Sequence, residues 1–243
     1  MNASTLQDRS RREFGQGIVI AADVNTLDEL SALTEVAADF SDVVALKLGA
    51  LLAIRFGLHQ AVSAVRRISD LPVIYDHQKA GTDIPQMGRP FARACRDAGV
   101  QAVIFFPMAG PKTLEAFVRG AQDEDLVPIV GLVMTHQMYL LREGGYIADD
   151  APEAICSTAL RLDVSHFVLP GTKPEVVREF ATGTLSRIRC RIFMPGIGSQ
   201  GGSLVTAIEA ARPHVALPIV GSAVYSATDP RRALAQFSAE LSR

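Results

Sequence analysis

Short apolar segments alternate with longer amphipathic segments along the chain. The apolar segments are rich in Val, Ile and Phe, and none shows a clear alternation of apolar and polar residues. This pattern is typical of parallel strands that are covered on both faces. We predict eight strands, at residues 17–22, 43–48, 72–75, 102–106, 127–134, 166–170, 191–195 and 217–221.

The segments between these strands carry apolar residues three and four positions apart, which is the period of an amphipathic helix. LDELSALTEVAADF, LLAIRFGLHQAVSAVRRI and RPFARACRDAG are examples. The last predicted helix follows Asp229, a suitable N-cap, and has Pro230 in its first turn. Eight strand–helix repeats predict an α/β fold, a (β/α)8 TIM barrel. Periodicity alone leaves open a doubly wound sheet or a ninth strand.

The length of 243 residues suits one large core, so we predict a single barrel domain over residues 1–243. Residues 1–16 are expected to form a polar N-terminal extension. That extension lacks the apolar core of a signal peptide, and no apolar run approaches the roughly 18 residues that span a bilayer. We therefore expect a cytoplasmic protein without a membrane partner.

Charge and cysteine content exclude some classes of function. The net charge of -2 leaves no basic field for a nucleic-acid backbone, so no nucleic-acid partner is expected. Cys95, Cys156 and Cys190 lie in apolar surroundings, without the spacing of disulfides or metal ligands. We expect three buried thiols.

Charged residues occur where the first three predicted strands end, and chemistry in such a barrel belongs at the C-terminal ends of the strands. Asp23 follows the first strand, Lys47 lies within the second, and Asp76, Lys79 and Asp83 follow the third. Alone, Asp23 has an ordinary explanation as a cap and Lys79 as a solvated loop residue. Lys47, flanked by apolar residues, needs a carboxylate partner or a lowered pKa. We expect Asp76 and Asp83 to be its partners, because consecutive parallel strands are usually neighbours.

Such an alternation of lysines and carboxylates would hold an ammonium group rigidly in a cavity of low dielectric constant. The ammonium could then donate a proton or stabilise developing negative charge. The sequence therefore predicts a site for carbanion chemistry that needs no metal.

Two glycine-rich segments follow the last two strands. They are MPGIGSQGGS at 194–203 and IVGSAVYSATDP at 219–230. Loops after the seventh and eighth strands commonly hold phosphate in this barrel, through backbone N–H groups that glycines allow to turn toward the anion. An ordinary turn is the alternative for each.

In order along the chain, IAADVNTLDE, ALKLGALL, YDHQKAGTDIP, VLPGTKPE, MPGIGSQGG and IVGSAVYSATDP resemble the motifs of the orotidine 5'-monophosphate decarboxylase family. The resemblance runs from about residue 17 to the end. It implies a (β/α)8 barrel, a homodimer with shared active sites, and neither metal nor organic cofactor. It also implies decarboxylation of orotidine 5'-monophosphate to uridine 5'-monophosphate in de novo pyrimidine biosynthesis.

The resemblance also implies roles for the charged residues. Asp23 would hydrogen-bond the ribose, and Lys47 would belong to the charged network and contact the sugar. Asp76 would lie beside the substrate carboxylate, and Lys79 would protonate C6 as CO2 leaves. Asp83 would reach across the dimer interface to the partner's ribose.

Further positions correspond to the parts of the family that hold base and phosphate. Thr135 stands where the family has a serine that touches the pyrimidine. The remaining substrate-binding positions implied are Pro195, Gly196, Gln200, Gly201, Gly221 and Ser222.

Two departures from the family are visible. The family spacing Asp-x-Lys-x-x-Asp is lengthened here by two residues, which places Gln78 where the shorter spacing would have lysine. A bulge with Gly81 supplying flexibility could restore the geometry, and we expect Lys79 rather than Gln78 to serve the site. In addition, Gly221 is followed by Ser222 where the family usually has arginine, so a planar guanidinium for the phosphate is lost.

Two other functions stay open. A related group of sugar-phosphate enzymes, the 3-keto-gulonate 6-phosphate decarboxylases and hexulose-phosphate synthases, uses Mg2+ and has Asp-Ala-Gly where this chain has Asp83, Ile84 and Pro85. Ile84, Pro85 and Gln200 favour the pyrimidine nucleotide. A barrel that binds a nucleotide without turnover is the third possibility.

Polar residues near the third and fifth strands complete the prediction. His77 and His136 are expected to line the mouth of the barrel rather than bind metal. The segment LREGGYIADD after the fifth strand is either a lid or a surface excursion.

Overall fold

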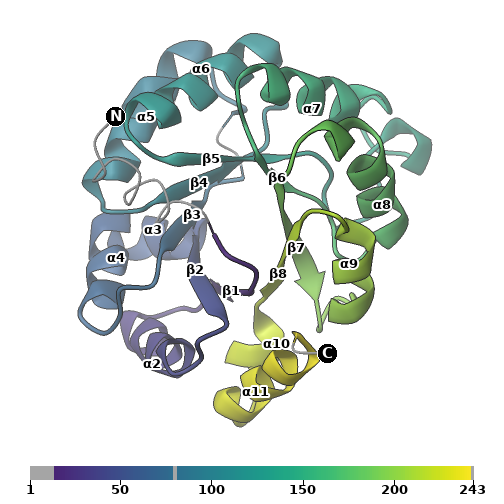
Figure 1. Cartoon of the computed structure of the whole chain (residues 1–243). Coiled ribbons are helices and arrows are strands. Elements are labelled where there is room, and N and C mark those ends of the chain that lie inside the picture. Colours follow the sequence, from purple (N-terminus) through teal and green to yellow (C-terminus); the bar gives the residue numbers. More distant parts are fainter. Residues whose placement is uncertain (1–13, 79–80, 242–243) are drawn as a thin grey trace, which may run out of the picture.

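The structure is a computed structural model that describes residues 14–78 and 81–241. Its strands close into one parallel barrel in the order β1 to β8, with helices around it (Figure 1). This confirms the predicted (β/α)8 fold. The strands are β1 (Ile18–Ala22), β2 (Val43–Gly49), β3 (Val73–Asp76), β4 (Ala102–Phe105), β5 (Val127–Gly131), β6 (His166–Val168), β7 (Arg191–Ile197) and β8 (Val215–Val220).

The helices follow the strands as the 3.6-residue period predicts. They are α2 (Leu27–Ala38), α3 (Ala50–Phe56), α4 (Leu58–Arg66), α5 (Gly88–Asp97), α6 (Pro111–Asp123), α7 (Ala151–Arg161), α8 (Pro174–Thr182), α9 (Leu204–Ala211), α10 (Ser222–Tyr225) and α11 (Pro230–Leu241). Asp229 caps α11 as predicted, because its Oδ1 accepts the N–H of Arg232 at 3.0 Å.

One predicted helix is divided. The apolar period runs through residues 51–68, but the chain breaks at Gly57, whose φ of 80° lies in the left-handed region, and so forms α3 and α4. A residue without a Cβ adopts this conformation at little cost. The break lets α3 follow directly from β2 while α4 packs beside α2.

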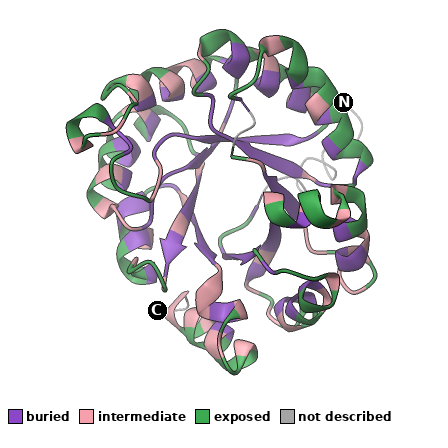
Figure 2. Cartoon of the chain, turned by 180° about the vertical axis from the view of Figure 1, so that it is seen from behind, coloured by how far each residue is buried: buried purple, intermediate pink, exposed green. Residues whose placement is uncertain are grey.

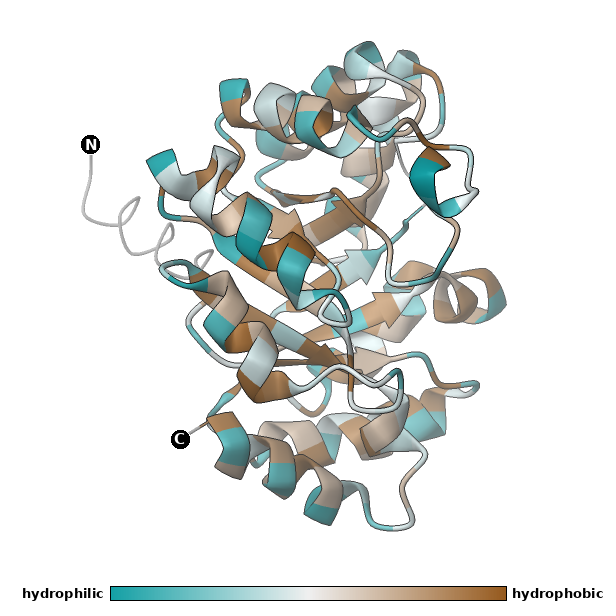
Figure 3. Cartoon of the chain, turned by 90° about the vertical axis from the view of Figure 1, so that its right-hand side faces the viewer, coloured by the Kyte–Doolittle hydropathy of each residue, from teal (hydrophilic) through white to brown (hydrophobic). Residues whose placement is uncertain are grey.

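Side chains alternate between two cores along each strand. In β1, Val19 and Ala21 point into the barrel, whereas Ile18 and Ile20 pack against the helices. The strands are therefore buried on both faces, and the helices expose only their outer sides (Figure 2). In the side view the strands are mostly hydrophobic, while hydrophilic residues gather on the outer helix faces (Figure 3). This double burial explains why the strand sequences show no apolar–polar alternation.

Phe14 closes the end of the barrel at which the strands begin. Its ring packs edge-on against Phe193, at a centroid distance of 5.4 Å, and against His166, at 6.1 Å. The backbone carbonyl of Phe14 accepts a hydrogen bond from Arg191 Nε at 2.8 Å. The predicted polar extension covered residues 1–16. Residues 1–13 lie outside the described part of the chain, and Phe14 is buried core.

The three cysteines are free and buried, as predicted. Burial raises the pKa of each thiol to about 12. These thiols are consequently protonated and unreactive near neutral pH. Across residues 14–78 and 81–241, every helix is too short or too polar to cross a bilayer.

Candidate active site

A cavity of about 180 Å³, lined by both polar and apolar residues, opens at the C-terminal ends of the strands. Nine of the twelve predicted site residues line it. They are Asp23, Lys47, Asp76, Thr135, Pro195, Gly196, Gln200, Gly221 and Ser222. Of the other three, Lys79 lies outside the described residues, and Asp83 and Gly201 do not line the cavity.

Strand parity explains why the charged residues converge. Ala21, Ala45 and Ile74 point into the barrel. Asp23, Lys47 and Asp76 each come two positions later, so their side chains point to the same interior. The register pairs Lys47 with Ile74, and Gly49 with Asp76, which brings the three charged groups to neighbouring strand ends.

Lys47 lies between two carboxylates. Its Nζ is 2.8 Å from Asp76 Oδ2 and 3.5 Å from Asp23 Oδ2. Only 7% of the Lys47 side chain and 8% of the Asp76 side chain are exposed, whereas 43% of the Asp23 side chain is open to the cavity mouth. The predicted carboxylate partner is therefore present, but Asp23 takes the place that the sequence analysis gave to Asp83.

The Lys47 ammonium is held in its charged form. Burial alone would lower its pKa, but the charges of Asp76 and Asp23, together with their hydrogen bonds, raise the pKa above the ordinary value. Among the described residues, none hydrogen-bonds to the buried Asp76 Oδ1. The lysine is thus a fixed positive charge rather than a neutral base, and one oxygen of Asp76 lies beside it in the cavity wall.

Gly49 allows Asp23 to approach this network, and sequence analysis missed its role. A Cβ at position 49 would collide with Asp23 Oδ1. The signal was present, since Gly49 lies two positions after the buried lysine, on the same face of β2.

Two described residues of the motif after β3, Gln78 and Asp83, lie in different surroundings. Gln78 lines the cavity, and its backbone carbonyl accepts the N–H of Phe106 at 3.2 Å. Gly81 has φ of 85°, in the left-handed region that glycine adopts at little cost. Asp83 is exposed, and its Oδ1 accepts the N–H of Ile84 at 2.7 Å, while its backbone carbonyl accepts from Thr113. Among the described residues, Asp83 therefore takes no part in the network of Lys47, Asp76 and Asp23.

The opposite side of the cavity is built by the loops after β7 and β8. Gly202 donates to the carbonyl of Gly196 at 3.1 Å, and Gly198 donates to the carbonyl of Gly202 at 2.9 Å, so the β7 loop is a closed turn. Gly196 has φ of 93°, and a Cβ there would lie 2.7 Å from Thr172 Cγ2. Pro195 and Gln200 line the cavity from this turn.

Two hydroxyl groups meet where the β7 loop approaches α10. Ser199 Oγ lies 2.7 Å from Ser222 Oγ, and both residues line the cavity with Tyr225. The sequence predicts Ser222 as a substrate-binding residue, but it does not predict Ser199 or Tyr225. No sequence pattern marks either of these, because serine is an ordinary loop residue and Tyr225 reads as part of an amphipathic helix.

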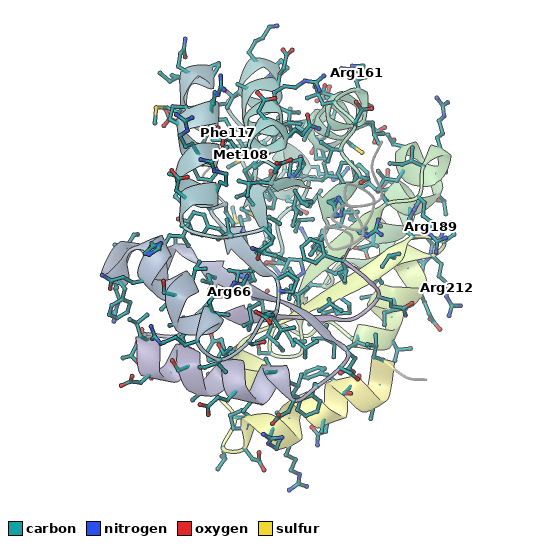
Figure 4. The ribbon with its side chains drawn as sticks, turned by 60° about the vertical axis from the view of Figure 1, so that its left-hand side comes forward. Arg66, Met108, Phe117, Arg161, Arg189 and Arg212 are labelled. Carbon is teal, nitrogen blue, oxygen red and sulfur yellow. The ribbon has the colours of Figure 1, made fainter. Side chains whose placement is uncertain are left out.

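Positive charge is scarce around the cavity. Of the described residues that line it, Lys47 alone is a lysine or arginine. Arg161, Arg189 and Arg212 lie at the edge of the molecule, away from the barrel interior (Figure 4). An anion bound near Ser199 and Ser222 would thus be held by neutral donors, in contrast to the guanidinium usual in the resembled family.

The rest of the cavity wall is mostly apolar, and part of it comes from β4 and the end of β5. The predicted strand 127–134 ends early, at Gly131, and the chain then carries Val133, Met134 and Thr135 into the cavity wall. With Ile104 and Phe106 these side chains form a surface suited to a flat ring.

His77 and His136 do not line the cavity, contrary to expectation. His77 Nδ1 lies 2.6 Å from the hydroxyl of Tyr75, and the exposed His136 packs edge-on against Tyr139. Within the described part of the chain, no group of three or more His, Cys, Asp or Glu side chains is arranged to hold a metal ion.

Comparisons with known proteins agree with the geometry. Residues 16–237 match the model of the orotidine 5'-phosphate decarboxylase / HUMPS family. The chain is 30% identical over 224 residues to orotidine 5'-phosphate decarboxylase of Methanosarcina mazei, with 92% of this chain and 94% of the relative covered. It is 31% identical over 229 residues to the enzyme of the same name from Pyrococcus abyssi, with 92% and 98% covered.

Solved structures show the same fold. The orotidine 5'-monophosphate decarboxylase of Methanocaldococcus jannaschii, complexed with the inhibitor BMP, superimposes with a TM-score of 0.81 at 21% identity, covering 94% of this chain and all of that chain. The enzyme of Pyrococcus horikoshii gives a TM-score of 0.75 at 24% identity, covering 93% and 99%. With a family match over nearly the whole length and a buried lysine–carboxylate site at the strand ends, the chain belongs to the orotidine 5'-phosphate decarboxylase / HUMPS family.

Proposed function

We propose that the protein decarboxylates orotidine 5'-monophosphate to uridine 5'-monophosphate in de novo pyrimidine biosynthesis. The observation that carries this proposal is Lys47, fixed as an ammonium between Asp76 and Asp23 at the strand ends. The relatives described above bear the name of this activity, and one solved relative holds the inhibitor BMP. The apolar wall beside the network suits a pyrimidine ring, and the closed β7 turn also lines the cavity.

The chemistry requires electrostatic stabilisation. The C6–carboxylate bond breaks, CO2 leaves, and the electron pair stays in an sp2 orbital on C6 that the ring cannot delocalise. A fixed ammonium in a cavity of low dielectric constant stabilises this charge as it develops. The substrate carboxylate, pressed against the buried Asp76, loses an unfavourable like-charge contact when CO2 departs. A proton delivered to C6 completes the reaction.

Lys79 is the proposed proton donor. The proposal rests on its place in the motif YDHQKAGTDIP, between Asp76 and Asp83. The neighbouring Gln78 lines the cavity, but an amide cannot deliver the proton. A Lys79→Ala protein should therefore bind uridine 5'-monophosphate and lose turnover. Turnover at the wild-type rate would exclude Lys79 as the donor.

We further propose that phosphate is held between the β7 loop and the start of α10. Ser199 and Ser222 supply hydroxyl donors, and Gln200 supplies an amide. The remote phosphate contributes binding energy that helps to press the substrate carboxylate against Asp76. Because the donors are neutral, nucleotide binding should depend less on salt concentration than it would if an arginine bound the phosphate.

The proposed assembly is a homodimer with shared sites. Asp83 is exposed. Leu51 and Ile54 on α3, Ile84, and Met87 in the 3-10 turn η1 (Pro85–Met87) after it are exposed as well. Exposed apolar residues around a polar one are typical of a protein interface. If Asp83 serves the partner's site, a mixture of inactive Asp83→Ala and Lys79→Ala homodimers should regain activity, since each hybrid dimer has one intact site. No regain after subunit exchange would contradict shared sites.

The reaction is tested by comparing substrates. Orotidine 5'-monophosphate should be consumed and uridine 5'-monophosphate formed, while 3-keto-gulonate 6-phosphate should be left unchanged with Mg2+ present. Calorimetry with uridine 5'-monophosphate tests the binding-only alternative, for which tight binding would accompany no turnover. We also propose the cytoplasm as the compartment, in line with the free, buried thiols.

A further inference from the structure

An ion pair outside the cavity joins the loop after β5, which lines the cavity, to the loop after β6. Residues 132–150 follow β5 and carry Thr135, while residues 169–173 follow β6 and carry Lys173. Lys173 Nζ lies 2.8 Å from Glu143 Oε1 and 3.5 Å from the backbone carbonyl oxygen of His136. His136 is the residue directly after Thr135, so the ammonium holds the chain at the edge of the cavity.

Glu143 also forms hydrogen bonds within the β5 loop. It lies in the 3-10 turn η2 (Leu141–Glu143), and its Oε2 accepts the N–H groups of Tyr139 at 3.0 Å and Leu140 at 3.4 Å. Hydrogen bonds from Lys173 and from these backbone groups lower the pKa of the Glu143 carboxyl, so the carboxylate is charged at neutral pH. One carboxylate therefore folds the loop upon itself and attaches it to the neighbouring loop.

The β6 loop is anchored on its other side to the β7 turn. Gly171 donates to the carbonyl of Pro195 at 2.9 Å, and the methyl group of Thr172 packs against Gly196. Pro195 and Gly196 line the cavity. Lys173 thus links the β6 loop, which is anchored to the β7 turn, to the longer β5 loop that carries Thr135.

The burial of the pair suits this link. The Lys173 side chain is 17% exposed and the Glu143 side chain 27% exposed, so water screens the pair less than it screens a fully exposed one. In the loops after β6, β7 and β8, Lys173 is also the one lysine or arginine. Its ammonium forms an ion pair with Glu143, and Lys173 does not line the cavity.

We propose that Lys173 and Glu143 are positioning residues, which clamp the β5 loop so that Thr135 is held against the base of the bound nucleotide. The part of this proposal that concerns the nucleotide rests on the proposed function. The clamp itself is a property of the two loops. Neither residue touches the substrate, so their effect is on binding and loop closure rather than on the chemical step.

The test uses four single variants of the full chain and one pair exchange. Lys173→Met removes the ammonium and keeps the stem, whereas Lys173→Arg keeps the charge. Glu143→Gln keeps an acceptor for Tyr139 and Leu140 but loses the charge. Lys112→Met is the matched control, because Lys112 forms an exposed ion pair with Glu115 on α6, away from the cavity. The double variant Lys173→Glu with Glu143→Lys reverses the pair.

Two measurements report on the clamp. Trypsin cleavage after the exposed Arg142 reports on opening of the β5 loop, and Lys173 itself is protected because Pro174 follows it. The second measurement is the KM and kcat for orotidine 5'-monophosphate. We expect Lys173→Met and Glu143→Gln to speed cleavage after Arg142 about tenfold and to raise KM about tenfold, with kcat changed less than threefold. Lys173→Arg and Lys112→Met should resemble wild type, and the reversed pair should recover part of the loss.

Unchanged cleavage and unchanged KM in Lys173→Met would overturn the proposal, as would equal effects of Lys112→Met. A loss confined to kcat would also overturn it, since that would place Lys173 in the chemical step. If wild type consumes no orotidine 5'-monophosphate, the proposed function fails instead. In that case the trypsin measurement still decides whether the clamp exists.

Discussion

Lys47 and Asp76 form a buried ion pair in which Nζ lies 2.8 Å from Oδ2 and the two side chains are 7% and 8% exposed. Removing one member of such a pair leaves the other as an uncompensated charge in a medium of low dielectric constant. The pair therefore links folding to the function of the cavity.

Lys47→Met should cost about 3 kcal/mol or more in the free energy of unfolding, because Asp76 loses its close ammonium partner. The matched control is Lys112→Met on α6, where Lys112 is 85% exposed and its loss should cost less than about 1 kcal/mol. Urea denaturation at neutral pH measures both. Equal costs for the two variants would show that the buried pair is not as tightly coupled as its geometry indicates.

The pH dependence of stability should contain a contribution from His166. Burial, and the nearby Arg191, lower the pKa of this imidazole from 6.5 to about 3, so the folded protein keeps the ring neutral. The unfolded chain binds a proton below about pH 6.5, and the folded chain does not until about pH 3. Stability from this group is thus complete above pH 6.5 and falls with decreasing pH, by up to about 1.4 kcal/mol per pH unit.

A His166→Phe protein should lose that contribution, and its unfolding free energy should fall less steeply between pH 6.5 and pH 4.5. His59→Phe, at an exposed position on α4, is the control. Urea denaturation over this pH range measures the slopes. The same slope in wild type and His166→Phe would contradict the assignment.

Ser222 is expected to limit affinity for the phosphate. Ser222→Arg introduces a guanidinium at a cavity whose described lining has Lys47 as its single cation, so uridine 5'-monophosphate should bind about tenfold more tightly at low salt. Ser226→Arg, on the exposed residue after α10, should change affinity less than twofold. Calorimetry measures both. If neither variant binds uridine 5'-monophosphate more tightly than wild type, the phosphate does not lie near Ser222.

Gly196 and Gly201 separate crowding from backbone strain. Both have positive φ, 93° and 90°, so alanine at either position should cost roughly 1 kcal/mol of stability. A Cβ at 196 would also press on Thr172, Gln200 and Thr135, whereas a Cβ at 201 would meet nothing within 4 Å. Gly196→Ala should therefore lower kcat/KM at least tenfold, and Gly201→Ala less than threefold. Similar activity losses would mean that strain alone matters at this turn.

Much of this architecture follows from the sequence, because doubly covered strands and amphipathic helices each have a distinct period. Strand parity also brings Asp23, Lys47 and Asp76 to one interior. Parity ends where the strand ends, however. Asp83 lies beyond the turn at Gly81, and nothing in the spacing shows that its side chain points to solvent. For this reason the sequence predicts Asp76 and Asp83 as the partners of Lys47, whereas the structure has Asp76 and Asp23.

Other features depend on contacts between segments that are far apart. Phe14 is an isolated apolar residue in a polar segment, and its burial is decided by Phe193 and His166 at the barrel floor. The hydrogen bond between Ser199 and Ser222 joins two loops, and neither loop predicts it alone. The link from Lys173 to Glu143 spans a similar separation. Local periodicity carries no information on such pairs.

Metal-independent decarboxylation is measured as the consumption of orotidine 5'-monophosphate by the purified protein in EDTA. We expect stoichiometric formation of uridine 5'-monophosphate and CO2, at the same rate with and without EDTA. Lys47→Met should abolish this turnover. No consumption of orotidine 5'-monophosphate, or consumption that EDTA stops and Mg2+ restores, would contradict a metal-independent decarboxylation at this site.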